Sequence, residues 1–254
     1  MTSPDLSTAE PIIEARNIAK SYGSVQALED VDFAVRPGET VALVGDNGAG
    51  KSTLVKILCG ALQPDSGSLH IGGEEVQLTG PRDARSRGVS VVYQDLALVD
   101  GFDVAHNVFL GRMPTRWLRV DRRRMIKETR RVLGELTVSL PSVRTPVRFL
   151  SGGQRQAVAI ARAVHQGGQL LIMDEPTAAL GVQEGTKVLQ LIENLKGREL
   201  AILVVSHNLE HVFAIADRIV VLRGGRVAGS REKLSATHSD IVHMIVGGQV
   251  QATP

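Results

Sequence analysis

The residues best suited to chemistry lie in a glycine-rich segment near the start of the chain. The segment GDNGAGKST, residues 45–53, follows the apolar run 41–44 and precedes the largely apolar residues 54–59. This order predicts a strand, a loop and a helix, and the loop matches the pattern G-x-x-x-x-G-K-S in full. Its glycines allow backbone N–H groups to point at one anion, and the helix adds its positive N-terminal end. A polyphosphate is the ligand that fits, and we expect it to be held by Gly45, Asp46, Asn47, Gly48, Ala49, Gly50, Lys51, Ser52 and Thr53.

Four side chains around this loop have predicted roles in binding or catalysis. Lys51 can reach the β- and γ-phosphates, and the Ser52 hydroxyl can bind a Mg²⁺ ion that bridges them. Asp174 and Glu175 follow the apolar run 170–173, which predicts a buried strand. Asp174 can hold the Mg²⁺ through a water, and Glu175 can polarise an attacking water. Glu175 could instead cap the turn that begins at Pro176, but the glycine loop favours catalysis.

Single polar side chains follow two further predicted strands. Gln94 follows residues 89–93, and an amide there suits both a metal ion and an attacking water. Without its context, Gln94 would be interpreted as a surface-loop residue. His207 follows residues 201–205, and an imidazole beside a phosphate site can donate to the γ-phosphate. A lone histidine is nevertheless more often structural.

A second turn suited to anions precedes the predicted helix 155–164. Ser151, Gly152 and Gly153 present backbone N–H groups at a helix N-terminus, and Gln154 completes the segment LSGGQ. It has no lysine or metal-binding hydroxyl beside it. Ahead of the glycine loop, the Tyr22 ring can stack on a purine, although a half-buried strand tyrosine is an equal interpretation.

The elements that position these residues form an α/β pattern. Two antiparallel strands are predicted at 12–22 and 26–35, before the glycine loop. The glycine pairs 72–73 and 224–225 predict hairpins, with strands at 68–71, 74–77, 218–223 and 226–230. Helices are predicted at 81–87, around the apolar stripe 188–195, and at 239–246.

A basic helix is predicted near the middle of the chain. Residues 112–131 carry nine basic side chains against Asp121 and Glu128. Met125 begins an apolar face that continues to Leu136, and Asp121 is a plausible N-cap. We favour a solvated basic face over contact with anionic lipid or nucleic acid.

Bulk properties narrow the functional class. A length of 254 residues suits one domain, and the formal charge of +2 with 3% aromatic residues argues against a nucleic-acid partner. The single cysteine, Cys59, excludes an internal disulfide and a cysteine-rich metal site. We expect no secretory signal, because residues 1–11 contain acids and prolines, and no membrane span, because no run of about 18 apolar residues occurs.

Taken together and in this order, the motifs resemble the ATP-binding subunit of an ABC transporter across almost the whole chain. The segment LSGGQ is that family's signature. The resemblance implies a P-loop NTPase core with a parallel sheet, an N-terminal antiparallel β-subdomain and a helical signature-motif subdomain at about 95–165. It implies one ATP-binding domain over 12–247, between flexible termini at 1–11 and 248–254.

The resemblance also implies roles and partners. Tyr22 would stack on adenine, Gln94 would link metal and water to the membrane partner, Glu175 would be the general base and His207 the γ-phosphate switch. Two subunits would pair head to tail, so that Ser151, Gly152, Gly153 and Gln154 of one close over the ATP and Mg²⁺ of the other. The subunit would be peripheral, at the cytoplasmic face of the inner membrane, on a transmembrane permease fed by a solute-binding protein.

Finer similarity points to importers of monosaccharides such as fructose, ribose or xylose. It lies in the segments VYQDLAL (92–98), NVFLGR (107–112) and PTAALG (176–181). Gly181 stands where most of the wider family has an Asp that helps to couple the two ATP sites, which affects the expected strength of coupling. Many such sugar ATPases are two fused copies of this domain, whereas this chain has one.

Two other functions compete with this reading. An ABC ATPase for export or lipid handling would share every catalytic residue and differ only in the surface from Gln94 to Arg112 that receives the permease. An ABC ATPase acting on DNA would need a long heptad insert, and the gap from Thr53 to Leu150 is too short for one.

Overall fold

The computed structural model describes residues 9–117, 119–196 and 200–247. The termini expected to be flexible are residues 1–11 and 248–254. Of these, residues 1–8 and 248–254 lie outside the described residues. Among the described residues, no helix is both long and apolar enough to cross a membrane.

A six-stranded sheet forms the centre of the molecule. Its order is β12-β11-β3-β10-β9-β6, and all neighbours are parallel except β12, which pairs antiparallel with β11. The strands are β3 (Thr40–Val44), β6 (Val89–Val92), β9 (Leu170–Asp174), β10 (Ala201–Val205), β11 (Arg218–Arg223) and β12 (Arg226–Glu232). The central strands β3 and β10 are buried along their whole length, which explains why they read as continuous apolar runs rather than as alternating patterns.

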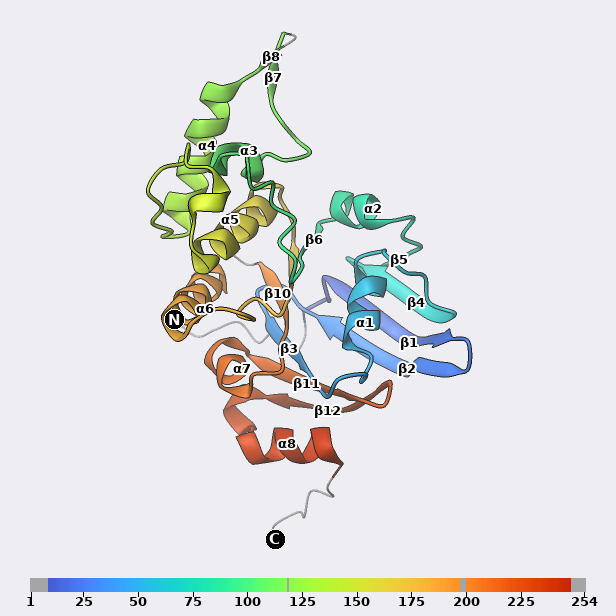
Figure 1. Ribbon diagram of the computed structural model, residues 1–254. Helices are drawn as coiled ribbons and strands as arrows, with labels where there is room; N and C mark the ends of the chain where they lie inside the picture. The colour runs from blue at the N-terminus through green and yellow to red at the C-terminus, as the bar shows by residue number, and fades with distance from the viewer. Residues whose placement is uncertain (1–8, 118, 197–199, 248–254) are drawn as a thin grey trace.

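A second sheet is entirely antiparallel and lies beside the first (Figure 1). Its order is β2-β1-β4-β5, with β1 (Ile13–Tyr22), β2 (Val25–Val35), β4 (Ser66–Ile71) and β5 (Glu74–Val76). Helix α1 (Lys51–Leu58) packs its apolar side chains into one core shared with both sheets. This core fixes the start of α1, and with it the glycine loop, between the two sheets.

Met173 of β9 and Val204 of β10 belong to a second core, on the other face of the parallel sheet from α1. A helical lobe is built around this core (Figure 1). It contains α3 (Val104–Val108), α4 (Arg122–Glu135) and α5 (Gly152–His165), and α5 packs on α6 (Val182–Lys196). A short hairpin, β7 (Thr115–Arg116) and β8 (Arg119–Val120), projects from this lobe away from both sheets (Figure 1).

Smaller elements complete the fold. The structure contains α2 (Pro81–Ser86), η2 (Val147–Phe149), α7 (Leu209–Ile215), η3 (Lys233–Ser235) and α8 (His238–Val246). Helix α8 covers strands β11 and β12. The architecture confirms the predicted fold class, with its parallel core, antiparallel β-subdomain and helical subdomain.

Element boundaries differ from the predictions at a few places. Helix α5 begins at Gly152, three residues earlier than expected from Arg155, because Ser151 caps it. Strand β6 ends at Val92, so Tyr93 lies beyond the strand. The hairpin β7–β8 and helices α3 and α7 were not predicted. Asp121 caps α4 as expected, and its side chain accepts a hydrogen bond from Arg124 N.

Candidate functional site

The predicted site residues gather at the carboxyl edge of the parallel sheet. Val205 of β10 is in register with both Leu43 of β3 and Asp174 of β9. Val92 of β6 is in register with Met173. The loops that leave these four strands therefore emerge at one edge, where open α/β sheets bind their ligands. They carry the glycine loop, Gln94, Asp174 with Glu175, and His207.

The backbone of the glycine loop requires its glycines. Gly45 and Gly50 have φ of 149° and 103°, and a Cβ at either position would collide with backbone. The Cβ of a residue at Gly45 would lie 2.0 Å from Leu222 O, and at Gly50 it would lie 2.5 Å from Ala27 O. Strands β11 and β2 therefore press directly on the loop, and only glycine permits this approach.

Helix α1 begins without a side-chain cap. Leu54 N–H donates to Gly50 O at 2.9 Å and starts the helical hydrogen bonding. In the described part of the chain, no side-chain oxygen caps the N–H groups of the turn before it. Ala49 N–H already donates to Asp46 O at 3.1 Å. The N–H groups that remain and the positive end of the helix are the groups predicted to bind an anion.

Lys51 lies between the loop and the acidic pair. Its Nζ donates to Gly45 O at 2.6 Å and to Asp46 O at 2.9 Å. Burial lowers the pKa of the Lys51 ammonium, while the charges of Glu175, Asp46 and Asp174 act in the opposite direction. The side chain is thus partly desolvated and close to the carboxylates, as a phosphate-binding lysine should be.

The acidic pair is held in two different environments. Burial, and then the charge of Glu175, raise the pKa of Asp174, and Lys51 only partly offsets this effect. Glu175 has φ of 50°, an uncommon conformation for a side chain of this type, and its N–H donates to Val205 O at 2.9 Å. Its Oε1 lies 2.8 Å from Nδ1 of His207, so the two residues predicted to act together are in contact.

Gln94 and Tyr22 lie on exposed ends of two other strands. Gln94 is exposed two residues after β6, and the preceding Tyr93 places its hydroxyl 3.7 Å from Cys59 Sγ at the end of α1. Burial and the adjacent Cys59 raise the pKa of Tyr93 to about 12. Tyr22 is half-exposed at the end of β1, on the hairpin whose Ala27 presses on the glycine loop.

The second turn is a capping box at the start of α5. Gln154 N–H donates to Ser151 Oγ at 3.4 Å, and Ser151 N–H donates to Gln154 Oε1 at 3.1 Å. The N–H group of Ser151, expected to face an anion, is therefore already bonded in this structure, which leaves those of Gly152 and Gly153. A Cβ at Gly152 would lie 2.8 Å from Leu180 Cδ2, so a larger residue there would have to displace the end of that side chain just before α6.

The two turns predicted to bind anions precede helices that pack into different cores. The helix that follows the glycine loop packs into the core shared by both sheets, whereas α5 packs into the core of the helical lobe. A cavity of about 380 Å³ beside Ser151 is lined by residues of α5, α6 and the segment 136–139 that follows α4, and by none of residues 45–53.

Two positioning residues were missed by the sequence reading. The Arg162 guanidinium on α5 donates to Leu96 O at 2.6 Å and Ala97 O at 2.8 Å, which ties the signature helix to the loop after Gln94. Asn107 is fully buried and hydrogen-bonds both N–H and O of Val99. The sequence does contain a signal for Asn107, because its amide lies within the largely apolar segment 104–109. A buried amide needs hydrogen-bond partners, so it was a candidate for holding a neighbouring loop. Nothing in the sequence identifies the partner of Arg162.

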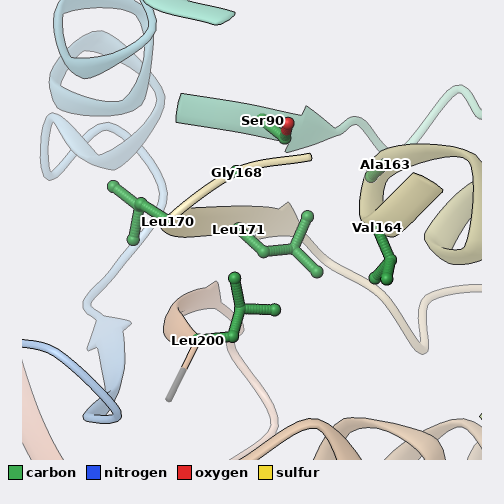
Figure 2. A pocket seen from close by; sticks show the side chains of 7 residues that line it. All are labelled: Ser90, Ala163, Val164, Gly168, Leu170, Leu171 and Leu200. Carbon is green, nitrogen blue, oxygen red and sulfur yellow. The ribbon is translucent and has the colours of Figure 1, made fainter. Parts of the chain in front are cut away.

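A separate cavity of about 140 Å³ is not part of this site. Val164, Leu171 and Leu200 surround it, with the hydroxyl of Ser90 at one side (Figure 2). It lies beside Leu170, at the opposite end of β9 from Asp174. Its largely apolar walls and this position make it a packing defect rather than a polyphosphate site.

The residues present fit a magnesium ion bound together with phosphates. Among the described residues, no group of three or more His, Cys, Asp and Glu side chains could hold a metal ion. Mg²⁺ does not need such a group, because one carboxylate, a hydroxyl and phosphate oxygens suffice. Asp174 offers such a carboxylate, and the pKa of this group is raised by burial and then by the charge of Glu175.

Comparison with known proteins identifies relatives of this chain. A family model described as "ABC transporter" matches residues 28–178. The chain is 43% identical over 234 residues to the xylose/arabinose import ATP-binding protein XylG of Sulfolobus acidocaldarius, covering 92% of this chain and 93% of that protein. It is 44% identical over 248 residues to the fructose import ATP-binding protein FrcA of Rhizobium meliloti, covering 94% and 95%. The ribose import ATP-binding protein RbsA of Yersinia pestis is 41% identical over 93% of this chain, which spans only 46% of that protein.

Solved structures have the same fold. An ATP-binding cassette in its ADP conformation matches with a TM-score of 0.80 at 23% identity, covering 94% of this chain and 100% of that chain. A dimeric cassette in a post-hydrolysis state, bound to ADP and Pi, matches with a TM-score of 0.74 at 26% identity, covering 87% and 98%.

Proposed function

The chain belongs to the ABC transporter family, and from that premise we propose that it is the ATP-hydrolysing subunit of an importer that takes up a monosaccharide through a separate transmembrane permease. The observation that carries the catalytic part is the meeting of Lys51, Glu175 and His207 at one edge of the parallel sheet. The import ATP-binding proteins named above support the choice of a sugar, because they match this chain over more than nine-tenths of its length.

Each site residue has a role in this proposal. The loop 45–53 holds the triphosphate, Lys51 neutralises its β- and γ-phosphates, and Tyr22 stacks on the adenine. Glu175 accepts a proton from the attacking water as general base. His207 donates to the γ-phosphate through Nε2, since its Nδ1 faces Glu175. The geometry supports this division, because Glu175 is largely buried and His207 is 72% exposed.

Ser52, Gln94 and Asp174 would hold Mg²⁺ together with the phosphates. The ion supplies charge neutralisation on the phosphate oxygens during transfer. Burial raises the pKa of Asp174 and so disfavours its charged form. A bound cation would stabilise the charged carboxylate and offset this free-energy cost.

A second subunit completes the site in this proposal. The two anion-binding turns of one chain lie in different lobes, so the turn 151–154 is better placed to reach the ATP of a partner copy in a head-to-tail dimer. The dimeric cassette bound to ADP and Pi supports such pairing. ATP bound between two copies favours the closed pair, and hydrolysis removes that preference.

The permease would contact the surface between Gln94 and Arg112, and through it hold the subunit at the cytoplasmic face of the membrane. Val99 and Phe102 are large apolar residues of this segment that remain exposed. Asn107 and Arg162 fix the backbone beneath them. A solute-binding protein would deliver the sugar to the permease and would not touch this chain.

Two rival functions are tested by the same preparation. The tagged chain is purified from membranes with its associated permease and reconstituted in liposomes, and ATP hydrolysis is measured with individual monosaccharides and the cognate solute-binding protein. We expect one sugar to stimulate hydrolysis and to accumulate inside. Stimulation by a lipid or by an outward substrate instead would replace import with export, and stimulation by DNA alone would remove the transport function.

A further inference from the structure

The hairpin β7–β8 presents an exposed tryptophan at the end of the helical lobe. Trp117 follows β7, and its side chain is 94% exposed. Arg116 and Arg119 pair across the hairpin on either side of it. Figure 1 shows the hairpin projecting beyond α4, away from both sheets. A single exposed apolar side chain is common on protein surfaces, so the significance of Trp117 depends on the charged residues around it.

The helix that follows the hairpin continues its positive charge. Arg122 pairs with Asp103, and Arg131 pairs with Glu128 and Glu135. Within the ranges that the structure describes, the remaining cations of the hairpin and α4 form no ion pair: Arg116, Arg119, Arg123, Arg124, Lys127 and Arg130. We call the hairpin and α4 together the basic arm. Its surplus of unpaired cations is much larger than the protein's net charge of +2 would suggest.

These two features match the chemistry of a bilayer surface. An indole has an apolar body and one N–H donor, and such side chains concentrate at the level of lipid headgroups. Arginine can extend along apolar surface while its guanidinium stays at the phosphates. Basic residues near an anionic membrane are each attracted to it, and the effect is lost beyond a Debye length.

The position of the basic arm favours lipid over other anionic partners. Arg122 NH2 lies 3.3 Å from Asp103 Oδ2, so the arm adjoins the segment 94–112. A subunit docked on a membrane permease through that segment would hold the arm near the bilayer, a step that rests on the proposed function. A single-stranded nucleic acid would need several rings for stacking, whereas Trp117 is the only tryptophan of the chain.

We propose that the basic arm binds the surface of an anionic phospholipid bilayer, with Trp117 among the headgroups and Arg116, Arg119 and Arg123 on lipid phosphates. The sequence alone favoured a solvated face, and the exposed indole of Trp117 changes that interpretation. The arm would give the subunit a second, permease-independent contact with the membrane. Binding should weaken with added salt.

The single tryptophan makes the test direct. Emission of the purified subunit is recorded with phosphatidylcholine vesicles, with and without phosphatidylglycerol, and with no permease present. We expect a blue shift and reduced acrylamide quenching with the anionic vesicles only. No change with anionic vesicles, or an equal change with neutral vesicles, would overturn the proposal. A change with a single-stranded oligonucleotide that exceeds the change with lipid would also overturn it.

Variants assign the binding to the arm. Arg116→Gln with Arg119→Gln should reduce the vesicle partition coefficient by roughly fivefold for each cation, measured by co-sedimentation. Trp117→Ala should also reduce it. Matched controls at the opposite end of the molecule, Arg231→Gln and the exposed Leu234→Ala, should bind as the unmodified chain does. Equal binding by arm variants and controls would refute the assignment. ATP binding is measured in parallel, so a failure here is distinguished from a failure of the ATPase function.

Discussion

Nδ1 of His207 lies 2.8 Å from Oε1 of Glu175. The contact joins the loop after β10 to the loop after β9, where Glu175 has φ of 50°. His207 remains 72% exposed, whereas Glu175 is only 17% exposed. The contact fixes the Glu175 carboxylate, the proposed general base, against His207, and it leaves Nε2 as the imidazole nitrogen proposed to face the γ-phosphate.

Glu175→Gln should bind ATP within a few-fold of the unmodified chain and hydrolyse it about 10²–10⁴ times more slowly. The amide has the same shape but cannot accept the proton of the attacking water. Phosphate release under saturating ATP, together with nucleotide binding by filter assay, measures both quantities. Glu193→Gln, on the exposed face of α6, is the control and should retain full hydrolysis. Hydrolysis in Glu175→Gln within threefold of normal would assign the base elsewhere.

His207→Ala should also slow hydrolysis while leaving ATP affinity nearly unchanged. It removes both the donor to the γ-phosphate and the partner that orients Glu175. His207→Gln, which retains an amide donor, should keep more activity than His207→Ala. If both variants hydrolyse ATP normally, the 2.8 Å contact with Glu175 is structural only.

Asp174→Asn should stabilise the nucleotide-free protein and impair Mg²⁺-dependent hydrolysis. Burial and the Glu175 charge raise the pKa of Asp174 in the folded state, so its ionisation costs stability near pH 7. The midpoint of thermal unfolding should therefore be higher in Asp174→Asn than in the unmodified chain. Calorimetry without nucleotide or metal measures this shift.

The pH dependence provides a further check on Asp174. Because the folded-state pKa is raised, the cost is fully present above it and disappears as pH falls towards the unfolded value of about 3.9. The difference in midpoint between Asp174→Asn and the unmodified chain should therefore shrink as pH falls from 7. A difference that grows in acid would show that the native carboxylate is stabilised instead.

Arg162→Gln should destabilise the fold by about 1–3 kcal/mol, because two backbone carbonyls lose a charged donor. It should also weaken stimulation of hydrolysis by the permease more than hydrolysis by the isolated chain, since the loop after Gln94 is released. Arg162→Lys keeps the charge without the forked geometry and should be intermediate. Denaturant unfolding measures the loss of stability, and ATPase assays with and without the permease measure the loss of activity. An equal loss of basal and permease-stimulated hydrolysis would leave Arg162 a purely structural role.

The strands and turns around the phosphate site were predictable because their signals are local. The pattern in residues 45–53 fixes a loop whose Gly45 and Gly50 have no room for a side chain, and apolar runs identify β3, β9 and β10. Parallel pairing then brings Asp174 and His207 to one edge without further information. The fold class and the gathering of these residues could therefore be derived from the sequence.

Other features depend on contacts that no local pattern encodes. The spacing of Ser151 and Gln154 is the sequence signature of a capping box, but the anion-site interpretation assigned the same N–H group to a ligand, and only the structure shows that Ser151 N–H is bonded to Gln154. Nor could it show that Arg162 reaches 66 residues back to Leu96. The exposure of Trp117 was equally hidden, since an aromatic residue within a charged stretch is as compatible with burial as with a surface.

The central claim is that the turn 151–154 of one subunit completes the ATP site of another, and light scattering after size exclusion tests it most directly. Glu175→Gln with saturating ATP should elute with twice the monomer mass and return to monomer without nucleotide. Adding Ser151→Arg to Glu175→Gln should abolish the dimer while each monomer still binds ATP. A monomer in all conditions with ATP bound, or a dimer that persists with Ser151→Arg, would contradict the account.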